Sequence, residues 1–439
     1  MESFAFTMII SRFLPLITLA SVFIYRILVD LSFLYYVIPF SSYERFTLQP
    51  NEFKIIESYI ILIALSLLLP HVTKRISALI IYVFFALIIV PFNSYYGLGD
   101  QSRYAFYLGN LFWFAVIVLN NKMRDLPVLS ILQKKFTNIT LLTISFFSLL
   151  TVTVLWIFFG ASLNLDFSVV YEIRKNYVSQ NIPFTGYLVN WCAKVFLPFL
   201  ALYSLFYFRK KILLIPLAFA FLIEVYLFSV TGNKAYIFSL VLALFFAWFI
   251  SNKNYFFQFN IIFSALCIVC LLSFLLMDDI WLSSFFSRRM LFIPAKLSYC
   301  YFDFFQDKSV YLSHSIFSYF FSYPFSLEPP YLIGQTYFDK PDMSANNGIM
   351  ADGYMNFGIA GLLIWATIFV LLLKLADSVS YGKNIKIFGA FFIIAFTNFI
   401  DGYLLTSLLT HGILIAYIVA FFYPPSLHTE VVDNKQNNI

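Results

Sequence analysis

The chain is a succession of apolar stretches separated by short polar connections. A helix that crosses a bilayer needs about 20 mostly apolar residues, and most of these stretches reach that length. We therefore expect about twelve membrane-spanning helices, at 8–40 (one span and a short further apolar stretch), 55–71, 76–95, 104–119, 138–160, 186–208, 212–230, 235–250, 256–276, 350–373, 385–400 and 404–423. The pattern predicts an all-α polytopic membrane protein, with residues 1–439 forming a single integral membrane domain.

One long segment leaves this pattern. From Met277 to Ile349 the chain is largely polar, and it then runs into an apolar helix predicted from Met350 to Lys374. Loops held on a rigid scaffold often carry functional residues. This segment is therefore the first place to look for function.

The distribution of lysine and arginine predicts the orientation, because short cytoplasmic loops of membrane proteins are rich in both. With both termini in the cytoplasm, the inner loops hold most of these residues, for example Lys74-Arg75 and Arg209-Lys210-Lys211. This arrangement puts residues 161–185 and 277–349 on the outer face. Residues 424–439 become a cytoplasmic tail.

Composition supports the membrane class and removes others. The chain is 61% apolar and 11% charged, whereas soluble domains carry about 25% charged residues. We attribute the net charge of +6 to cytoplasmic anchors and expect no nucleic-acid partner. The four scattered cysteines do not form a disulfide framework. Nucleotide-binding glycine motifs are absent from the sequence, and we expect neither a metal nor a cofactor.

Several basic residues lie on the predicted outer face, where short loops usually avoid them. Arg174 is in the first outer segment, and Arg288 and Arg289 open the second. The planar guanidinium donates paired hydrogen bonds to phosphate, so these residues suit a phosphate or pyrophosphate group. The alternative is that they only reach lipid phosphates at the interface. Lys234, in the tight turn Thr231–Lys234, is either a further cation of that site or an exposed turn residue.

Two residues are candidates for a general base. His314 is the only histidine between 277 and 349, and imidazole commonly deprotonates hydroxyl groups; it could equally be a packed turn residue. Asp352 lies at the start of a predicted span, four residues before Asn356, so both side chains fall on one helical face. Its alternative role is to complement the helix dipole. Asn346-Asn347-Gly348 is a turn signal that also offers amides to sugar hydroxyls.

The order of these features resembles the O-antigen or polysaccharide repeat-unit polymerase family (Wzy). The resemblance covers most of the second half of the chain, roughly from the fifth predicted span onwards. It is carried by Arg174 in an E-I-R-x-x-Y segment, Gly232-Asn233-Lys234 before a span, the run Arg288–Ala295, Ile333-Gly334, and the run Ser344–Gly358 leading into Gly361.

This resemblance implies a GT-C-like glycosyltransferase in the bacterial inner (plasma) membrane, with its active site facing the periplasm. Such enzymes transfer a growing glycan from undecaprenyl pyrophosphate to a new lipid-linked repeat unit, without a metal or cofactor. The implied partners are the lipid-linked donor and acceptor, membrane lipids and a chain-length regulator protein. The implied roles are pyrophosphate binding for Arg174, Arg288, Arg289 and Lys234, a base at His314 or Asp352, and sugar binding for Asn346, Asn347 and Tyr354.

Other functions remain open. An O-antigen ligase has the same architecture and donor but glycosylates lipid A core, so the acceptor distinguishes it. A polysaccharide flippase is expected to have charges within its spans and internal repeats. A membrane acyltransferase is expected to have a histidine in a span, for which His411 lacks an accompanying acid.

Overall fold

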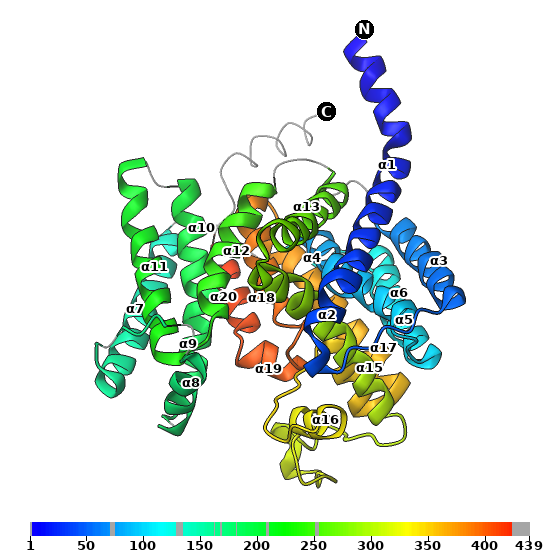
Figure 1. The fold of residues 1–439 in the computed structure, drawn as a ribbon. Helices are drawn as coiled ribbons and strands as arrows, with labels where there is room; N and C mark the ends of the chain where they lie inside the picture. The colour runs from blue at the N-terminus through cyan, green and yellow to red at the C-terminus, as the bar shows by residue number, and fades with distance from the viewer. Residues whose placement is uncertain are drawn as a thin grey trace. The chain divides into compact units, whose positions relative to one another are not determined.

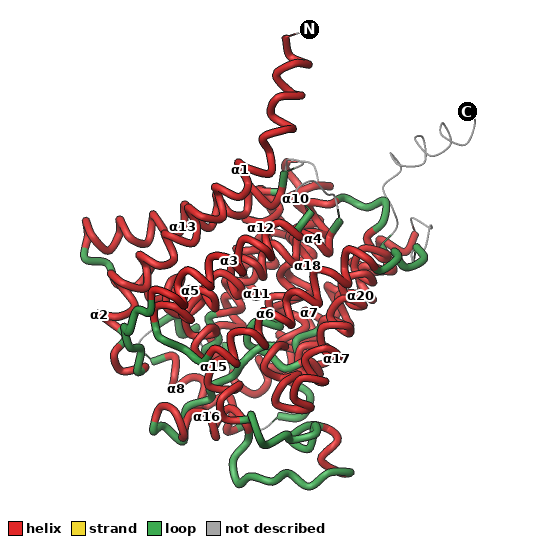
Figure 2. The backbone as a smooth tube through the Cα atoms, turned by 90° about the vertical axis from the view of Figure 1, so that its right-hand side faces the viewer, coloured by secondary structure: helices red, strands yellow, loops and turns green. Residues whose placement is uncertain are grey.

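A computed structural model describes residues 2–70, 75–128, 135–161, 163–166, 169–180, 182–207, 210–250 and 254–423. Over these ranges the protein is helical and contains no strand (Figure 2). Eight of the described helices are long and apolar enough to cross a membrane: Pro15–Phe40, Ile76–Leu98, Arg103–Lys122, Asn138–Phe159, Thr185–Tyr207, Tyr255–Met277, Ile349–Ser380 and Leu404–Phe422. The expected all-α polytopic membrane protein is confirmed at this level.

Helix is found in each of the twelve expected ranges. Three shorter apolar helices, Ile215–Thr231, Ala235–Phe249 and Ile385–Thr397, account for further expected spans, and Glu52–Leu68 accounts for another. Twelve crossings and a GT-C-like arrangement both stay predictions. The expected cytoplasmic tail, 424–439, lies outside the described residues.

The chain divides into two compact units, which we describe separately. Unit 1 comprises Met1–Arg124, Asn252–Leu373 and Phe399–Leu404, and unit 2 comprises Asp125–Ser251, Lys374–Asn398 and Leu405–Ile439. Unit 1 holds α1 (Glu2–Ser32), η1 (Phe33–Val37), α2 (Ile38–Phe40), η2 (Ser42–Glu44), α3 (Glu52–Leu68), α4 (Ile76–Phe84), η3 (Phe85–Ile89), α5 (Val90–Leu98), α6 (Arg103–Lys122), α13 (Tyr255–Met277), α14 (Ile280–Ser283), η5 (Ser284–Phe292), α15 (Ile293–Phe304), η6 (Ile316–Tyr319), α16 (Pro329–Phe338) and most of α17 (Ile349–Ser380) (Figure 1).

Unit 2 holds the remaining helices, labelled in the same figure. These are α7 (Lys135–Phe159), α8 (Val170–Ser179), α9 (Thr185–Trp191), η4 (Cys192–Phe196), α10 (Leu197–Tyr207), α11 (Lys210–Thr231), α12 (Ala235–Phe249), α18 (Ile385–Thr397), most of α19 (Leu404–Leu409) and α20 (Ile413–Phe422).

The core of unit 1 is the helix run α4–η3–α5, which is buried along its whole length. Polar contacts accompany this position, since the buried amide of Asn93 donates to the carbonyl of Ile89 (2.8 Å) and to the Asn110 side chain of α6 (3.1 Å). Helices α1, α3, α13 and α15 pack around it. The ring of Phe92 stacks on Tyr299 of α15 at 4.4 Å.

The first part of the expected polar segment 277–349 differs from a loop. Residues 280–304 form α14, η5 and α15, and α15 is buried from Pro294 to Phe302. Apolar residues such as Leu297 and Phe302 fill the core, while neighbouring charges lower the average hydropathy of the stretch. Because of this low average hydropathy, the sequence did not predict a helix that belongs to the core.

The expected continuous helix from Met350 to Lys374 is broken. Its backbone leaves helical geometry at Phe357 and Gly358, where Gly358 has φ +58° and ψ −139°. Only glycine adopts that region readily. The break brings Gly361 against the carbonyl oxygen of Gly353, which would lie 1.9 Å from a Cβ at Gly361. The sequence signal for a break was Gly358, within an otherwise helical pattern.

Candidate functional site

Two membrane-spanning helices of unit 1 end at the same place. The first span ends at Phe40 and α13 ends at Met277. The hydroxyl of Tyr36 donates a hydrogen bond to the carbonyl of Ile280 (2.7 Å), and the rings of Phe40 and Phe274 are 5.0 Å apart. The segments that follow, η2 and η5, therefore start side by side at one end of the spans.

Basic side chains collect around η2 and the turn that follows it. We call this group the basic cluster: Arg45, Arg288, Arg289, Lys296 and Lys340, with two carboxyl groups, Glu44 and Asp339. Its residues come from three segments far apart in the chain, namely the turn after α2, the run η5–α15 and the end of α16. Positive charge is in excess over negative charge here.

Arg288 is the most constrained member of the cluster. Its guanidinium forms an ion pair with Glu44 and lies 5.8 Å from the ring centre of Tyr43. Its Nε donates a hydrogen bond to the Ser284 hydroxyl (3.0 Å). Burial raises the pKa of Glu44, although the nearby Arg288 opposes this shift. The pair fixes the Arg288 side chain at the cluster.

Lys296 is hydrogen-bonded to the backbone of the turn at Glu44 and Arg45. Its ammonium group donates hydrogen bonds to the backbone carbonyls of Glu44 and Arg45, and burial lowers the pKa of Lys296 to about 8. Arg45 has φ +56°, a left-handed conformation that non-glycine residues adopt at a cost. The buried lysine therefore holds a strained turn that presents Tyr43 and Arg45.

The end of α16 closes over the same turn. Arg45 pairs with Asp339 and donates a hydrogen bond to the carbonyl of Tyr337 (3.1 Å). The ammonium group of Lys340 lies 5.7 Å from the ring centre of Tyr43, the same ring that Arg288 approaches.

The exposed members give the cluster access to a ligand. The Arg45 side chain is 49% exposed, and Arg289 is exposed. Guanidinium groups beside a membrane surface bind phosphate oxygens by charge-assisted, paired hydrogen bonds. The arrangement is thus suited to an anionic group carried by a lipid.

Unit 2 brings together the two remaining predicted phosphate ligands. Arg174 on α8 donates a hydrogen bond to the carbonyl of Gly232 (3.2 Å), two residues before Lys234. Gly232 has φ +64°, and a Cβ there would meet the Val170 carbonyl at 2.6 Å, so the turn needs glycine. The expected turn is confirmed. A single site holding these residues together with Arg288 and Arg289 of unit 1 stays a prediction.

His314 lies in a turn at 311–315, as its alternative interpretation expected. Its ring packs 5.5 Å from that of Tyr403, and its Nδ1 is buried without a hydrogen-bond partner among the described residues. Burial lowers the pKa of His314 to about 4. The imidazole is neutral at pH 7 and can accept a hydrogen bond from a hydroxyl, but it is a weak base.

Asp352 is buried in unit 1, and its carboxylate connects three parts of the chain. Its carboxylate accepts hydrogen bonds from Asn356 (2.8 Å), Trp365 (2.9 Å) and the backbone N–H of Leu404 (2.8 Å). The predicted shared face of Asp352 and Asn356 is confirmed. These contacts join the two sides of the α17 break and favour a positioning role over that of a base, which stays a prediction.

The predicted sugar-binding residues differ in access. Asn346 is exposed, whereas Asn347 is buried and bonds to the Ser298 hydroxyl at 3.4 Å. Tyr354 is 1% exposed and its hydroxyl lies 3.5 Å from that of Tyr104. The expected turn at 346–348 is absent: residues 343–348 have no turn, and Gly348 instead packs against the carbonyls of Phe399 and Ile400.

The sequence did not identify the contributions of Tyr43, Glu44, Arg45 and Lys340. Arg45 carried a usable signal, because it is a positive charge on the expected outer side, directly after a span. The contact of the neighbouring Glu44 with Arg288 joins residues that are 244 positions apart, which no local pattern contains.

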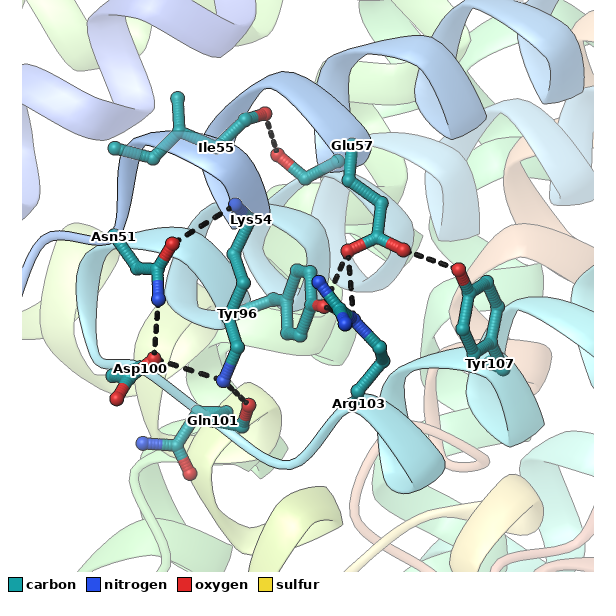
Figure 3. Close-up of polar contacts among 10 residues, drawn as sticks. Asn51, Lys54, Ile55, Glu57, Tyr96, Asp100, Gln101, Arg103 and Tyr107 are labelled. Atoms are coloured by element: carbon teal, nitrogen blue, oxygen red, sulfur yellow. Dashed lines mark hydrogen bonds and ion pairs between the residues drawn. The ribbon is translucent and has the colours of Figure 1, made fainter.

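A second group of charged residues in unit 1 has a different balance (Figure 3). Glu57 accepts hydrogen bonds from Tyr96 (2.6 Å) and Arg103 (3.3 Å), as well as from Tyr107. Lys54 pairs with Asp100 at 2.8 Å. We call these residues the balanced network, because each basic side chain has its own carboxylate.

Neither the distribution of metal-binding side chains nor a comparison with known proteins assigns a function to this chain. Within the described residues no group of three or more histidine, cysteine, aspartate or glutamate side chains could hold a metal ion. No protein-family model, no curated protein and no solved structure matches this chain.

Proposed function

We propose that the protein is a membrane glycosyltransferase that polymerises lipid-linked oligosaccharide repeat units into O-antigen or a related surface polysaccharide. The observation that carries this proposal is the basic cluster: an excess of partly exposed positive charge where two spans end. A lipid-linked pyrophosphate has its charge at that depth, with its hydrocarbon chain in the bilayer.

Glycosyl transfer from a lipid pyrophosphate needs cations to stabilise the leaving group, and it needs no nucleotide-binding site. In glycosyl transfer the acceptor hydroxyl oxygen attacks the anomeric carbon, and the bond from that carbon to the pyrophosphate oxygen breaks. The pyrophosphate leaves with the electron pair, so fixed cations lower the barrier by stabilising the developing negative charge. We assign this role to Arg288 and Arg289, together with Arg45.

The hydroxyl proton needs an acceptor, and the described geometry ranks the two candidates. His314 has an unpartnered Nδ1, whereas the oxygens of Asp352 are occupied by three donors. We assign His314 to accept a hydrogen bond from the hydroxyl and so orient it, a role that a neutral imidazole with a pKa of about 4 can fill. Asp352 is assigned to hold the broken helix beside it.

The same site suits an O-antigen ligase, because both enzymes release a polyprenyl pyrophosphate. A complementation gel separates them. A strain lacking this chain that shows core bearing one repeat unit, with a ladder restored by the wild type, supports the polymerase. Bare core with accumulated long lipid-linked polymer indicates the ligase, and repeat units retained on the cytoplasmic face indicate a flippase.

Matched variants connect the phenotype to the cluster. Arg289→Ala removes an exposed cation of the basic cluster, and Arg103→Ala removes an exposed cation of the balanced network. Loss of the ladder in the first variant alone, at equal protein level, supports the proposed pyrophosphate site. Equal ladders in both variants contradict it.

A further inference from the structure

The segment between α15 and α16 ends in an exposed apolar tip. Of the six residues Ile316–Phe321, which we call the loop tip, Ile316 is 66% exposed, Tyr319 97%, Phe320 77% and Phe321 52%. In Figure 1 this stretch lies in the yellow-green segment next to α16. Contiguous exposed apolar side chains of this size mark surfaces that contact membranes or other proteins.

The base of the loop is firmly held. The backbone N–H of Val310 donates to the carbonyl of Met355 (3.1 Å), and that of Leu312 donates to Asn356 (2.7 Å). On the other side, the hydroxyl of Tyr323 donates to the carbonyl of Leu327 (2.8 Å). The tip is therefore presented by an ordered base.

The loop carries almost no charge. No lysine, arginine, aspartate or glutamate occurs from Ser309 to Leu327, and burial keeps His314 neutral at pH 7 by lowering its pKa to about 4. Protein interfaces are also rich in tyrosine and phenylalanine, but they enclose these residues in a polar rim. An uncharged tip rich in tyrosine and phenylalanine is instead typical of the membrane–water interface.

The bilayer is within reach of the tip. The loop base is hydrogen-bonded to Met355 and Asn356 in α17, a helix able to cross the membrane. Eight residues separate Tyr311 from Tyr319, a maximum extension of about 28 Å. Because the base of the loop is hydrogen-bonded to a helix able to cross the membrane, lipid is present at high local concentration near the tip.

We propose that the loop tip inserts its aromatic and aliphatic side chains into the interfacial region of the lipid bilayer. After residues 322–328 the helix α16 begins at Pro329, and it is followed by Asp339 and Lys340, which belong to the basic cluster. Insertion of the tip therefore restrains the segment that supplies these two residues. This inference rests on the membrane location and stands independently of the glycosyltransferase assignment.

The test measures the depth of single probes in the full chain. Phe320→Cys is labelled with an environment-sensitive fluorophore, and the protein is reconstituted into phosphatidylcholine nanodiscs with and without lipids that carry a quencher on the acyl chain. Asp342→Cys, an exposed polar position after α16, is the matched control. The native cysteines are at most 7% exposed, and unsubstituted protein measures their residual labelling.

We expect lipid quenching at position 320 to exceed that at position 342 by at least about twofold, because interfacial aromatic side chains lie below the headgroups. Tyr319→Cys should behave like Phe320→Cys. The nanodiscs contain only this chain, lipid and a scaffold protein that is the same in every sample, so no cellular partner can produce the difference between the two positions. Equal quenching at 320 and 342 overturns the proposal and leaves the tip as a protein-binding surface.

Discussion

Unit 1 contains two groups of charged residues near helix ends, and they differ in the ratio of basic to acidic side chains. In the balanced network Lys54 has Asp100 and Arg103 has Glu57, with tyrosine hydroxyls completing the carboxylate contacts (Figure 3). In the basic cluster five basic side chains share two carboxyl groups. Paired charges of the first kind join helices α3, α5 and α6, whereas we propose that the excess positive charge of the second kind binds a ligand.

The largest expected effect comes from Arg288→Ala. The substitution removes the ion-pair partner of the largely buried Glu44, and breaking a buried pair costs about 3 kcal/mol. We expect a lower apparent melting temperature and loss of the polysaccharide ladder. Adding Glu44→Gln should restore much of the stability without restoring the ladder; recovery of the ladder in the double variant would show that Arg288 serves only the fold.

Arg289→Ala should affect function without affecting the fold. Arg289 is exposed, and losing a charge-assisted hydrogen bond to phosphate weakens binding by roughly tenfold or more. Titration of the purified protein with a polyprenyl pyrophosphate measures this loss. Unchanged affinity, at an unchanged melting temperature, would remove Arg289 from the site.

The pH dependence of stability tests Lys296. Burial lowers its pKa from 10.5 to about 8, so between about pH 8 and 10 the unfolded chain keeps a proton that the folded protein has released. Stability contributed by this residue should therefore rise with pH across that window. The apparent melting temperature of wild type, compared with that of Lys296→Met, should improve from pH 8 to pH 10; a constant difference contradicts the buried placement.

The smallest effect is expected in the balanced network. Arg103 is 58% exposed, and exposed ion pairs contribute little to stability. Arg103→Ala should leave both the ladder and the affinity for polyprenyl pyrophosphate unchanged. A loss equal to that of Arg289→Ala would mean that the two regions do not differ in the way that we infer.

The sequence predicted the fold class and the helix positions because apolar length is a local signal. It also identified Arg288 and Arg289 as unusual residues beside a span. It did not predict that η5 and α15 belong to the core, since their charged residues lowered the average hydropathy. Nor did it assemble the basic cluster, because the meeting of Glu44 with Arg288 depends on tertiary packing between distant segments.

Asp352 also shows that helical spacing predicts only some of a residue's contacts. Its position at a helix start made it a candidate base, and its relation to Asn356 followed from helical spacing. Its contacts with Trp365 and Leu404 follow from the break at Gly358 and from a later segment of the chain. These partners favour a structural role that spacing alone could not indicate.

The central claim is that the basic cluster binds the pyrophosphate of a lipid-linked substrate, and direct binding tests it best. Affinity for undecaprenyl pyrophosphate should be measured for wild type, Arg45→Ala/Arg289→Ala and Lys54→Ala/Arg103→Ala in nanodiscs at one fixed salt concentration. We predict at least tenfold weaker binding, roughly the loss of one charge-assisted contact, for the first double variant and wild-type affinity for the second. Equal affinity in all three proteins would contradict the claim.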